Sequence, residues 1–283
     1  LRRLSSSLSA ASHAAKRESF LGRLVSNELK AAQMRPMTCD SNEFYGHGHV
    51  LRAYAGLPLG PIRGRVQHGW APVGFESDEL VKRGEPVYVW AERDAVELRR
   101  DCPSANPIMM GAPYLYTESR DAVPERKGVV SFPHHSLNRN VLSDTSRWHA
   151  YAHDFYAWAK AEGLLPATVC LHIRDFERAG VVKALKDSGV HVDMCGDAMN
   201  PFFLKRFDNI ALRHAAATSN RVSTAIFYCL FMGMPCVVRG DPMRCDPPDI
   251  HEEATGAVDW IREHYPSLLQ LGENQLLAAR QLG

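Results

Sequence analysis

The sequence predicts an α/β protein with parallel sheets, and three observations lead to that prediction. From residue 36 onward, short apolar runs of strand length recur along the chain, and helical stretches separate the later runs. Alternation of strand, helix and strand at this spacing is typical of βαβ units, which build parallel sheets. The composition, 45% hydrophobic and 23% charged, is that of a globular protein with a substantial core. The length of 283 residues suffices for about two domains.

Each expected strand combines apolar residues with strand length. The expected strands are residues 64–67, 86–90, 107–110, 128–132, 168–173, 190–194, 215–218 and 235–239. Helical stretches lie between the later ones, at residues 145–162, 176–188, 202–213 and 222–233. The second half of the chain therefore has the better defined pattern.

A charged segment divides the chain into two unequal units. Residues 117–127 contain Pro124 and have no apolar period, which is typical of a linker. We expect an N-terminal α/β domain over 38–120 and a C-terminal Rossmann-like domain over 125–260. The polar ends of their strands would then face a shared cleft.

The two ends of the chain are expected to be helical. Residues 1–37 are rich in Ser, Ala and basic residues, and their second half has apolar residues at helical spacing. A helix packed on its own domain, or a linker, is the favoured interpretation, and docking on an anionic membrane surface is the alternative. Because the chain begins with Leu1, we expect a trimmed protein or a piece of a larger one. The C-terminal segment 261–283 is expected to form a helix that packs back across the first unit.

Composition and missing motifs exclude several classes of protein. Lys plus Arg (33) nearly balance Asp plus Glu (32), unlike the strongly basic balance of a general nucleic-acid binder. No apolar run is long enough to span a bilayer. Seven cysteines without CxxC spacing fit neither a disulfide framework nor a zinc site, so a reducing cytoplasm is expected. The absence of GxGxxG, GxxxxGK[ST] and GxSxG motifs argues against a dehydrogenase, a P-loop kinase and an α/β-hydrolase.

Polar residues follow four of the expected strands. Ligands of parallel α/β proteins bind at the carboxyl ends of the strands, so these residues are candidates for a site. The candidates are His68, His134, His135, Ser136, Arg174, Ser219 and Asn220.

The segment 219–224 has the features of an anion site at the start of a helix. Ser219 or Asn220 would cap the following helix, whose free N–H groups and dipole suit a phosphate. Ser223 and Thr224 would add hydroxyl donors. The alternative is that the polar residues only cap a helix.

His68 is the strongest candidate for proton transfer. Imidazole titrates near neutral pH, and Gly69 allows the backbone to approach a ligand closely. The alternative is a histidine that is hydrogen-bonded within a turn. His134 and His135 point in opposite directions if extended, so one of them would contact a phosphate or a leaving-group oxygen and the other would be structural.

A second polar cluster lies at residues 39–50, where two glycines suggest a flexible loop that covers a substrate. A carboxylate of this cluster is the alternative general base. A His-Gly-His pair can bind metal, but a third ligand is missing, so no metal site is expected. The candidate residues of this cluster are Asp40, Glu43, His47 and His49. The nearby arginines Arg52, Arg63 and Arg65 form either a solvated basic edge or contacts with an anionic acceptor.

Four short motifs resemble a known family. They are "QHGW" after a strand, "GAPYLY" some 40 residues later, "VVSFPHHS" at the start of the second unit, and "AAATSNRVSTAIFYCLFMGMPCVV" near the end. Their order over roughly residues 38–245 resembles that of bacterial surface-polysaccharide transferases of the GT-B type, which have two Rossmann domains. The similarity is greatest to the CDP-glycerol glycerophosphotransferase-like group, and capsule and lipopolysaccharide transferases share the layout.

The resemblance implies a role for each candidate. His68 would be the base that activates the acceptor, with His47, His49 and Trp70 on the acceptor side. His134, Ser219, Asn220 and Ser223 would surround the phosphates of the donor, and His135, Ser136, Arg174 and Thr224 are expected with them. The family's "HGTPLK" reads HGWAPV from His68 here, without the Lys, and its "GxPRxD" reads GAPY from Gly111, without the Arg. A nucleotide sugar is therefore at least as plausible a donor as CDP-glycerol.

The expected activity is metal-independent transfer of a sugar from a nucleotide-activated donor to a carbohydrate acceptor in surface-polysaccharide synthesis, without a cofactor. The donor and acceptor are the expected partners, and the expected location is the cytoplasm or the inner face of the membrane. Glycerophosphate transfer, epimerisation of a sugar nucleotide on the same fold, and a non-catalytic binding module of a larger transferase are the alternatives.

Overall fold

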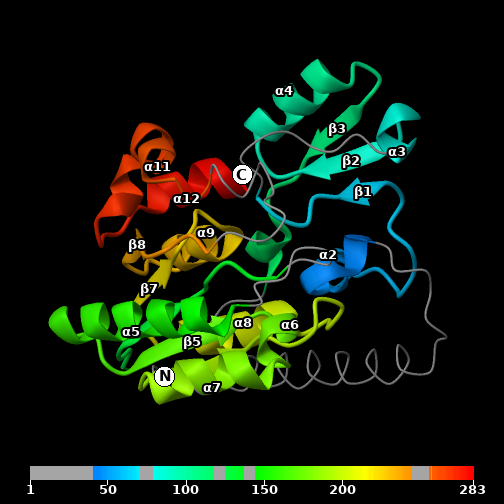
Figure 1. The fold of residues 1–283 in the computed structure, drawn as a ribbon. Helices are drawn as coiled ribbons and strands as arrows, with labels where there is room; N and C mark the ends of the chain where they lie inside the picture. The colour runs from blue at the N-terminus through cyan, green and yellow to red at the C-terminus, as the bar shows by residue number, and fades with distance from the viewer. Residues whose placement is uncertain (1–40, 71–78, 118–124, 137–143, 244–254, 256) are drawn as a thin grey trace, which may run out of the picture.

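The computed structural model describes residues 41–70, 79–117, 125–136, 144–243, 255 and 257–283. Two separate parallel sheets and their helices make up this part of the chain (Figure 1). The expectation of an α/β protein with parallel sheets is confirmed. The helix and possible leader expected within residues 1–37 lie outside the described residues, as does most of the segment expected to be a linker.

The first sheet has three parallel strands in sequence order. They are β1 (Arg65–Val66), β2 (Pro86–Val89) and β3 (Asn106–Met109). Two helices lie between them in the chain, α3 (Glu79–Lys82) and α4 (Glu92–Asp101). Val87 and Val89 alternate with more exposed residues along β2 and pack against Leu98 of α4 in a small apolar cluster.

The second sheet has five parallel strands in the order β6-β5-β4-β7-β8. They are β4 (Val129–Ser131), β5 (Ala167–Leu171), β6 (His191–Met194), β7 (Ala216–Ser219) and β8 (Cys236–Val238). The chain starts in the middle at β4, builds outward to β6, and then returns to add β7 on the other side. This is the strand order of a doubly wound, Rossmann-type sheet, with a switch point between β4 and β7.

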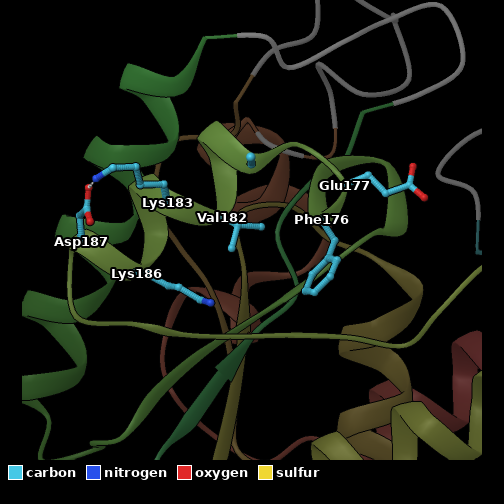
Figure 2. Close-up of a pocket in the computed structure, with 7 residues that line it drawn as sticks. Phe176, Glu177, Val182, Lys183, Lys186 and Asp187 are labelled. Atoms are coloured by element: carbon cyan, nitrogen blue, oxygen red, sulfur yellow. Dashed lines mark hydrogen bonds and ion pairs between the residues drawn. The ribbon is translucent and has the colours of Figure 1, made fainter.

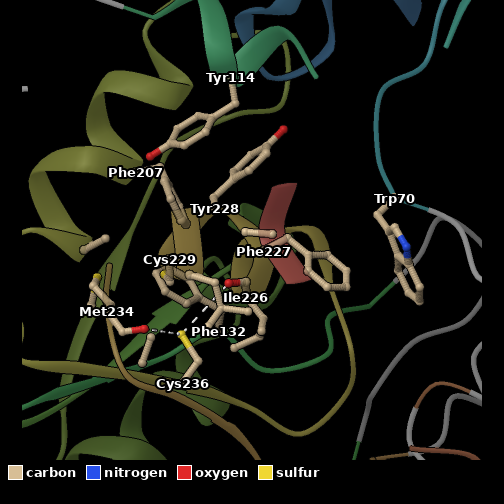
Figure 3. Packing of buried hydrophobic residues seen from close by; sticks show 14 of the residues in the cluster. Trp70, Tyr114, Phe132, Phe207, Ile226, Phe227, Tyr228, Cys229, Met234 and Cys236 are labelled. Carbon is tan, nitrogen blue, oxygen red and sulfur yellow. Dashed lines mark hydrogen bonds between the residues drawn. The ribbon is translucent and has the colours of Figure 1, made fainter. Parts of the chain in front are cut away.

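Helices cover both faces of the second sheet. They are α5 (Thr145–Ala161), α6 (Ile173–Phe176), α7 (Ala179–Asp187), α8 (Phe203–Ala211) and α9 (Thr224–Phe231). Val129 packs with Trp148 of α5, whereas its neighbour Val130 packs in the opposite cluster with Phe207 of α8 and Phe227 of α9. Figure 3 shows Phe207 and Phe227 within this second cluster. Because successive side chains point to opposite faces, both faces of the central strand are buried.

The expected strands agree with the observed ones to within two residues at each end, but two helices differ. The stretch 176–188 divides into α6 and α7 because Arg178 has extended backbone (φ −91°, ψ 99°). The stretch 222–233 begins later, at Thr224, because Ser223 is extended (φ −146°, ψ 161°) and occupies the N-cap position. The proposed capping role of Ser219 or Asn220 is therefore wrong.

The described part of the segment expected to be a flexible loop, residues 41–50, is instead helical. Residues Ser41–Gly46 form the short helix η1, and α2 (His47–Ala55) follows it. The Asn42 side chain donates hydrogen bonds to the carbonyl oxygens of Ile62 and Gly64 and accepts one from Val66 N at 2.7 Å. These bonds fix η1 against β1, so Gly46 and Gly48 do not confer a free loop.

The C-terminal segment crosses to the first sheet, as expected, but as several short elements. They are α11 (Val258–His264), η3 (Pro266–Leu269) and α12 (Gln275–Leu282). Gln281 of α12 accepts hydrogen bonds from Trp70 Nε1 at 2.7 Å and from Arg93 Nη1 at 3.2 Å. Ala112 N, within the turn that leads to η2 (Pro113–Tyr116), donates to Leu282 O at 2.6 Å.

Two further observations concern the residues that the structure describes. None of their helices has the length and apolar character needed to cross a membrane. Their five cysteines, Cys102, Cys170, Cys195, Cys229 and Cys236, are free thiols in buried positions.

Candidate functional site

The loops that follow β4 and β7 meet at the switch point of the second sheet. Asn220, which follows β7 and is 1% exposed, accepts a hydrogen bond from His134 N at 2.7 Å through its side-chain oxygen. Its side-chain nitrogen donates to Asp241 O at 2.7 Å, beyond β8. The Asn220 side chain thus connects the ends of three strands, and it acts as a support for the site.

A second set of bonds connects the ends of β4 and β5. Ser136 donates to the Asp175 carboxylate from both its backbone nitrogen, at 2.9 Å, and its hydroxyl, at 2.6 Å. Asp175 is fully buried, and Arg178 Nη1 lies 3.9 Å from it. The Ser136 hydroxyl is therefore engaged in a hydrogen bond within the protein, to Asp175. Arg174, next to Asp175, is exposed at the end of β5.

Histidines line this edge of the sheet, and one of them escaped the sequence analysis. The ring of His135 stacks on that of His172, with centroids 4.4 Å apart and an angle of 17°, and the centroid of the His134 ring lies 5.9 Å from that of His135. Burial, with the charges of His135 and Arg174, lowers the pKa of His172 to about 4, which keeps it neutral at pH 7. His172 was missed because the expected strand 168–173 included it, whereas β5 ends at Leu171.

His68 is placed where the first sheet meets the second. It follows β1, and the rings of Phe44 and Tyr45 lie 5.5 Å and 6.3 Å from it. Burial lowers the pKa of His68, and the charge of Arg65 lowers it further. A half-buried imidazole that is neutral at pH 7 can accept a proton.

The His68 loop lies against the start of α9. Trp70 N donates a hydrogen bond to Thr224 Oγ1 at 2.9 Å, and a Cβ on Gly69 would lie 3.5 Å from the same oxygen. The structure therefore brings together His68 and the segment 219–224, which are far apart in the sequence. The Thr224 hydroxyl accepts the bond that joins them.

Serines of the segment 219–224 have different surroundings. Ser219 is 1% exposed, and its hydroxyl accepts from Arg221 N at 3.3 Å. Ser223 Oγ, at the N-cap of α9, is shielded from solvent and has no hydrogen-bond partner among the described residues. An unpartnered buried hydroxyl beside the free N–H groups of a helix start is a favourable place for an anionic ligand.

Trp70 belongs to the core, contrary to the expected acceptor-side contact. Its side chain is 9% exposed and packs against Phe227, with ring centroids 5.2 Å apart (Figure 3), and against Tyr265, with centroids 5.8 Å apart. Its Nε1 donates to Gln281. The backbone of Trp70, which bonds to Thr224, contributes to the site, but the indole faces away from it into the core.

Glu43 does not have the free carboxylate expected of a general base. Both of its oxygens accept hydrogen bonds from Arg52, at 2.7 Å and 2.6 Å. A Cβ on Gly48 would lie 2.6 Å from Glu43 Oε1, so this glycine makes room for the ion pair. The structure corrects the expectation for Glu43, whereas Asp40 lies outside the described residues.

His47 and His49 are buried on α2 instead of lining an open loop. His47 is 1% exposed and His49 is 9% exposed. His47 Nδ1 and His49 Nε2 have no hydrogen-bond partner among the described residues. Burial and the charge of His68 lower the pKa of His47 to about 3, and burial and Arg52 lower that of His49. These positions do not support a direct contact with an acceptor at the surface.

Other candidate features lie away from the strand ends. Arg63 is largely exposed and forms an ion pair with Glu85 at 3.1 Å. An open hollow of about 530 Å³ lies along α7. Figure 2 shows side chains that line it, among them Phe176, Val182 and the ion pair between Lys183 and Asp187. The hollow has none of the predicted site residues. Within the described part of the chain, no group of three or more His, Cys, Asp or Glu is arranged to hold a metal.

The fold and these strand ends define an α/β protein with a Rossmann-type sheet and a polar site at its switch point. No protein-family model and no curated protein matches the sequence. Among solved structures, the chain is similar to that described as an S. aureus MnaA–UDP co-structure (13% identity, TM-score 0.37) and to TarM (9% identity, TM-score 0.36). The alignments cover 69% and 77% of this chain but 48% and 44% of those chains. The chain thus spans about half the length of each, and similarities of this size define neither a family nor a function.

Proposed function

We propose that the chain is a metal-independent transferase that moves a sugar from a nucleotide-activated donor to a hydroxyl group of a carbohydrate. The observation that carries the proposal is the hydrogen bond from Trp70 N to Thr224 Oγ1. It holds the His68 loop of one sheet against the start of α9 in the other. The proposed proton acceptor and the proposed anion-binding helix start therefore lie close to each other.

The second sheet is proposed to bind the nucleotide. Its strand order supports a ligand at the switch point between β4 and β7. The N–H groups at the start of α9, the Ser223 hydroxyl and the exposed Arg174 are suited to the phosphates. The imidazoles of His134 and His135 lie at the same edge of the sheet. Because the net charge is only +1, recognition of the phosphates would depend on these local groups.

The proposed reaction needs one proton acceptor and one stabilised leaving group. His68 takes the proton from the acceptor hydroxyl as its oxygen forms a bond to the anomeric carbon of the sugar. The bond between that carbon and the phosphate oxygen breaks, and the nucleoside diphosphate leaves. The positive end of α9 stabilises the charge that develops on the phosphate. Asp40 is the alternative base proposed from the sequence.

The resemblance described from the sequence motifs supports the wider context of this proposal. It favours two Rossmann-like domains of the GT-B type with a cleft between them, and a role in bacterial surface-polysaccharide synthesis at the inner face of the membrane. Glycerophosphate transfer, epimerisation and binding without catalysis are treated as outcomes of the test.

Thermal unfolding with UDP, CDP, GDP, CMP and their sugar conjugates tests the binding step. A ligand present at 100 times its Kd stabilises the folded state by about 2.7 kcal/mol. We expect nucleotides with one particular nucleobase to stabilise the protein. The sugar conjugate of that nucleotide should be consumed when a carbohydrate acceptor is added. If no nucleotide raises the unfolding temperature, the proposed function is wrong. Binding without turnover identifies a non-catalytic module, and labelled products separate transfer from epimerisation.

His68→Gln tests the catalytic step. We expect kcat/KM for transfer to fall by roughly 100-fold or more, since this is the usual size of a general-base contribution. His191→Gln is the matched control. His191 is exposed at the amino end of β6, whereas the candidate site lies at the carboxyl ends of the strands. Since the pKa of His68 is lowered, the midpoint of the fall of kcat/KM at acid pH should lie below about 6.5 in the unaltered protein. Full activity of His68→Gln would exclude His68 as the base.

A further inference from the structure

Tyr45 has an unusual backbone at the junction of the two sheets. Its φ of 57° and ψ of 18° lie in the left-handed region, which a bulky aromatic residue rarely adopts. Its backbone nitrogen donates to Ala198 O at 2.5 Å, in the loop after β6. The next residue, Gly46, also has positive φ, and a Cβ there would lie 2.5 Å from Pro201 O. A strained residue held in this way is typical of functional sites.

The strained backbone directs the Tyr45 ring into the candidate site. The centroid of the ring lies 4.9 Å from that of Phe203, the first residue of α8, and 6.3 Å from that of His68, and the ring is inclined at 29° to the imidazole. It also lies 5.9 Å from the ring of His47. Tyr45 therefore contacts the proposed base from the first sheet and a helix of the second sheet, and its side chain is half-buried.

The hydroxyl of Tyr45 is suited to donate a hydrogen bond to an anion. Burial raises the pKa of Tyr45, so the phenol keeps its proton at neutral pH. The charge of Arg174, which is exposed at the end of β5, acts in the opposite direction and lowers the pKa, so this cation lies within electrostatic range of the phenol. The Tyr45 ring lies next to His68, whose loop bonds to the start of α9, so a neutral phenol donor there is suited to a phosphate oxygen bound at that helix start.

We propose that Tyr45 binds the donor: its hydroxyl donates a hydrogen bond to a phosphate oxygen of the nucleotide-linked donor that Arg174 also contacts. This inference rests on the proposed function, because it takes the nucleotide to bind at the ends of β4, β5 and β7. It adds a phosphate contact from the first sheet to the groups that the second sheet provides. The bound donor would then touch both sheets.

Tyr45→Phe tests the proposal because it removes the hydroxyl and retains the ring and its packing. Calorimetric titrations with UDP, CDP and GDP identify the diphosphate that the unaltered protein binds. We expect Tyr45→Phe to raise the Kd for that diphosphate roughly tenfold, because one hydrogen bond to a charged group is lost. Binding of the corresponding nucleoside should not change. Tyr54→Phe is the matched control, because Tyr54 lies on α2 and is 69% exposed.

The outcomes separate this inference from the function on which it rests. If the unaltered protein binds none of the three diphosphates, both fail. If it binds one and Tyr45→Phe binds that diphosphate equally well, only the role of Tyr45 is wrong. The same conclusion follows if the substitution weakens binding of the nucleoside as much as binding of the diphosphate.

Arg174→Gln, alone and combined with Tyr45→Phe, provides a second measurement. If both residues contact the same phosphate, the effect of Tyr45→Phe should be smaller in the Arg174→Gln background. Strictly additive effects would overturn the shared contact. Unfolding temperatures of the unliganded variants establish that each is folded before its affinity is compared.

Discussion

The two sheets begin in the same way and are then stabilised differently. Gly64 precedes the first sheet and Gly128 the second, both with positive φ, and a Cβ on either would overlap a proline carbonyl oxygen, that of Pro86 or Pro166. The second sheet is buried between two large apolar clusters. The first has three strands and a small cluster around Val87. The smaller sheet therefore depends on contacts from distant segments, through Asn42 of η1 and Gln281 of α12.

The largest expected effect is that of Gly128→Ala. We expect the free energy of unfolding to fall by about 3 kcal/mol or more, because the residue is strained at φ +73° and the overlap is with backbone at the start of β5. Gly163→Ala is the control, since Gly163 has φ +71° with open space around it, and it should cost about 1 kcal/mol. Urea denaturation measures both. Equal losses would show that the overlap is relieved by a small shift.

Gly64→Ala tests the corresponding position at the start of the first sheet. We expect a smaller loss than for Gly128→Ala, about 2 kcal/mol, because β1 is a two-residue edge strand that can move away. Hydrogen exchange should show the loss in the first sheet, with the second sheet still protected. A uniform loss of protection in both sheets would mean that they unfold as one unit.

Gln281→Ala tests the dependence of the first sheet on the C-terminal segment. The substitution removes the side-chain oxygen that accepts hydrogen bonds from Trp70 Nε1 and Arg93 Nη1, and we expect a loss of about 2 kcal/mol in denaturant unfolding. Leu276→Ala on the same helix is the control, because Leu276 is 66% exposed and its change should stay within about 0.5 kcal/mol. If Gln281→Ala behaves like Leu276→Ala, the first sheet does not rely on this contact.

Buried histidine at the junction of the sheets predicts a pH dependence. The pKa of His47 is about 3 in the folded protein and about 6.5 when unfolded, so the unfolded chain binds more protons between these values. The stabilisation is complete above pH 6.5 and is lost as the pH falls, by about 2 kcal/mol at pH 5. Urea midpoints at several pH values measure it. His47→Gln should flatten this slope, and an unchanged slope would assign it to other groups, such as His172.

The smallest effect is expected in the hollow along α7. Lys183→Ala removes an exposed ion pair, with Lys183 Nζ 2.5 Å from Asp187, and should change stability by less than about 0.5 kcal/mol. Nucleotide binding, measured by thermal shift, should not change. Loss of nucleotide binding in this variant would move the site from the strand ends to this hollow.

The alternating strands and helices of the fold could be predicted from the sequence because their apolar residues recur with a regular period. Runs such as 128–132 and 215–218 have apolar residues on both faces, which identifies central strands of a parallel sheet. The helices α2 and α4 were not predicted. Helix α4 is largely charged, and α2 begins with two histidines and a glycine, so neither has a strong apolar stripe.

The site could be predicted only in part, because tertiary contacts decide which polar groups are free. The strand-end rule placed His68, Asn220 and Arg174 in one region. It could not show that Arg52 occupies both oxygens of Glu43, since a pair nine residues apart across a kinked turn has no sequence signature. Nor could it find Tyr45, whose position follows from a left-handed backbone that aromatic residues rarely adopt.

The hydrogen bond between Trp70 and Thr224 also indicates the order of events in folding. It closes a loop of 154 residues, whereas strand pairs such as β2 with β3 join neighbouring parts of the chain. Long loops are entropically costly to close, and such contacts form after local ones in folding. The sheets can therefore assemble before the site does. Nucleotide binding during refolding should appear in the last phase, as the step that reports docking of the His68 loop on α9.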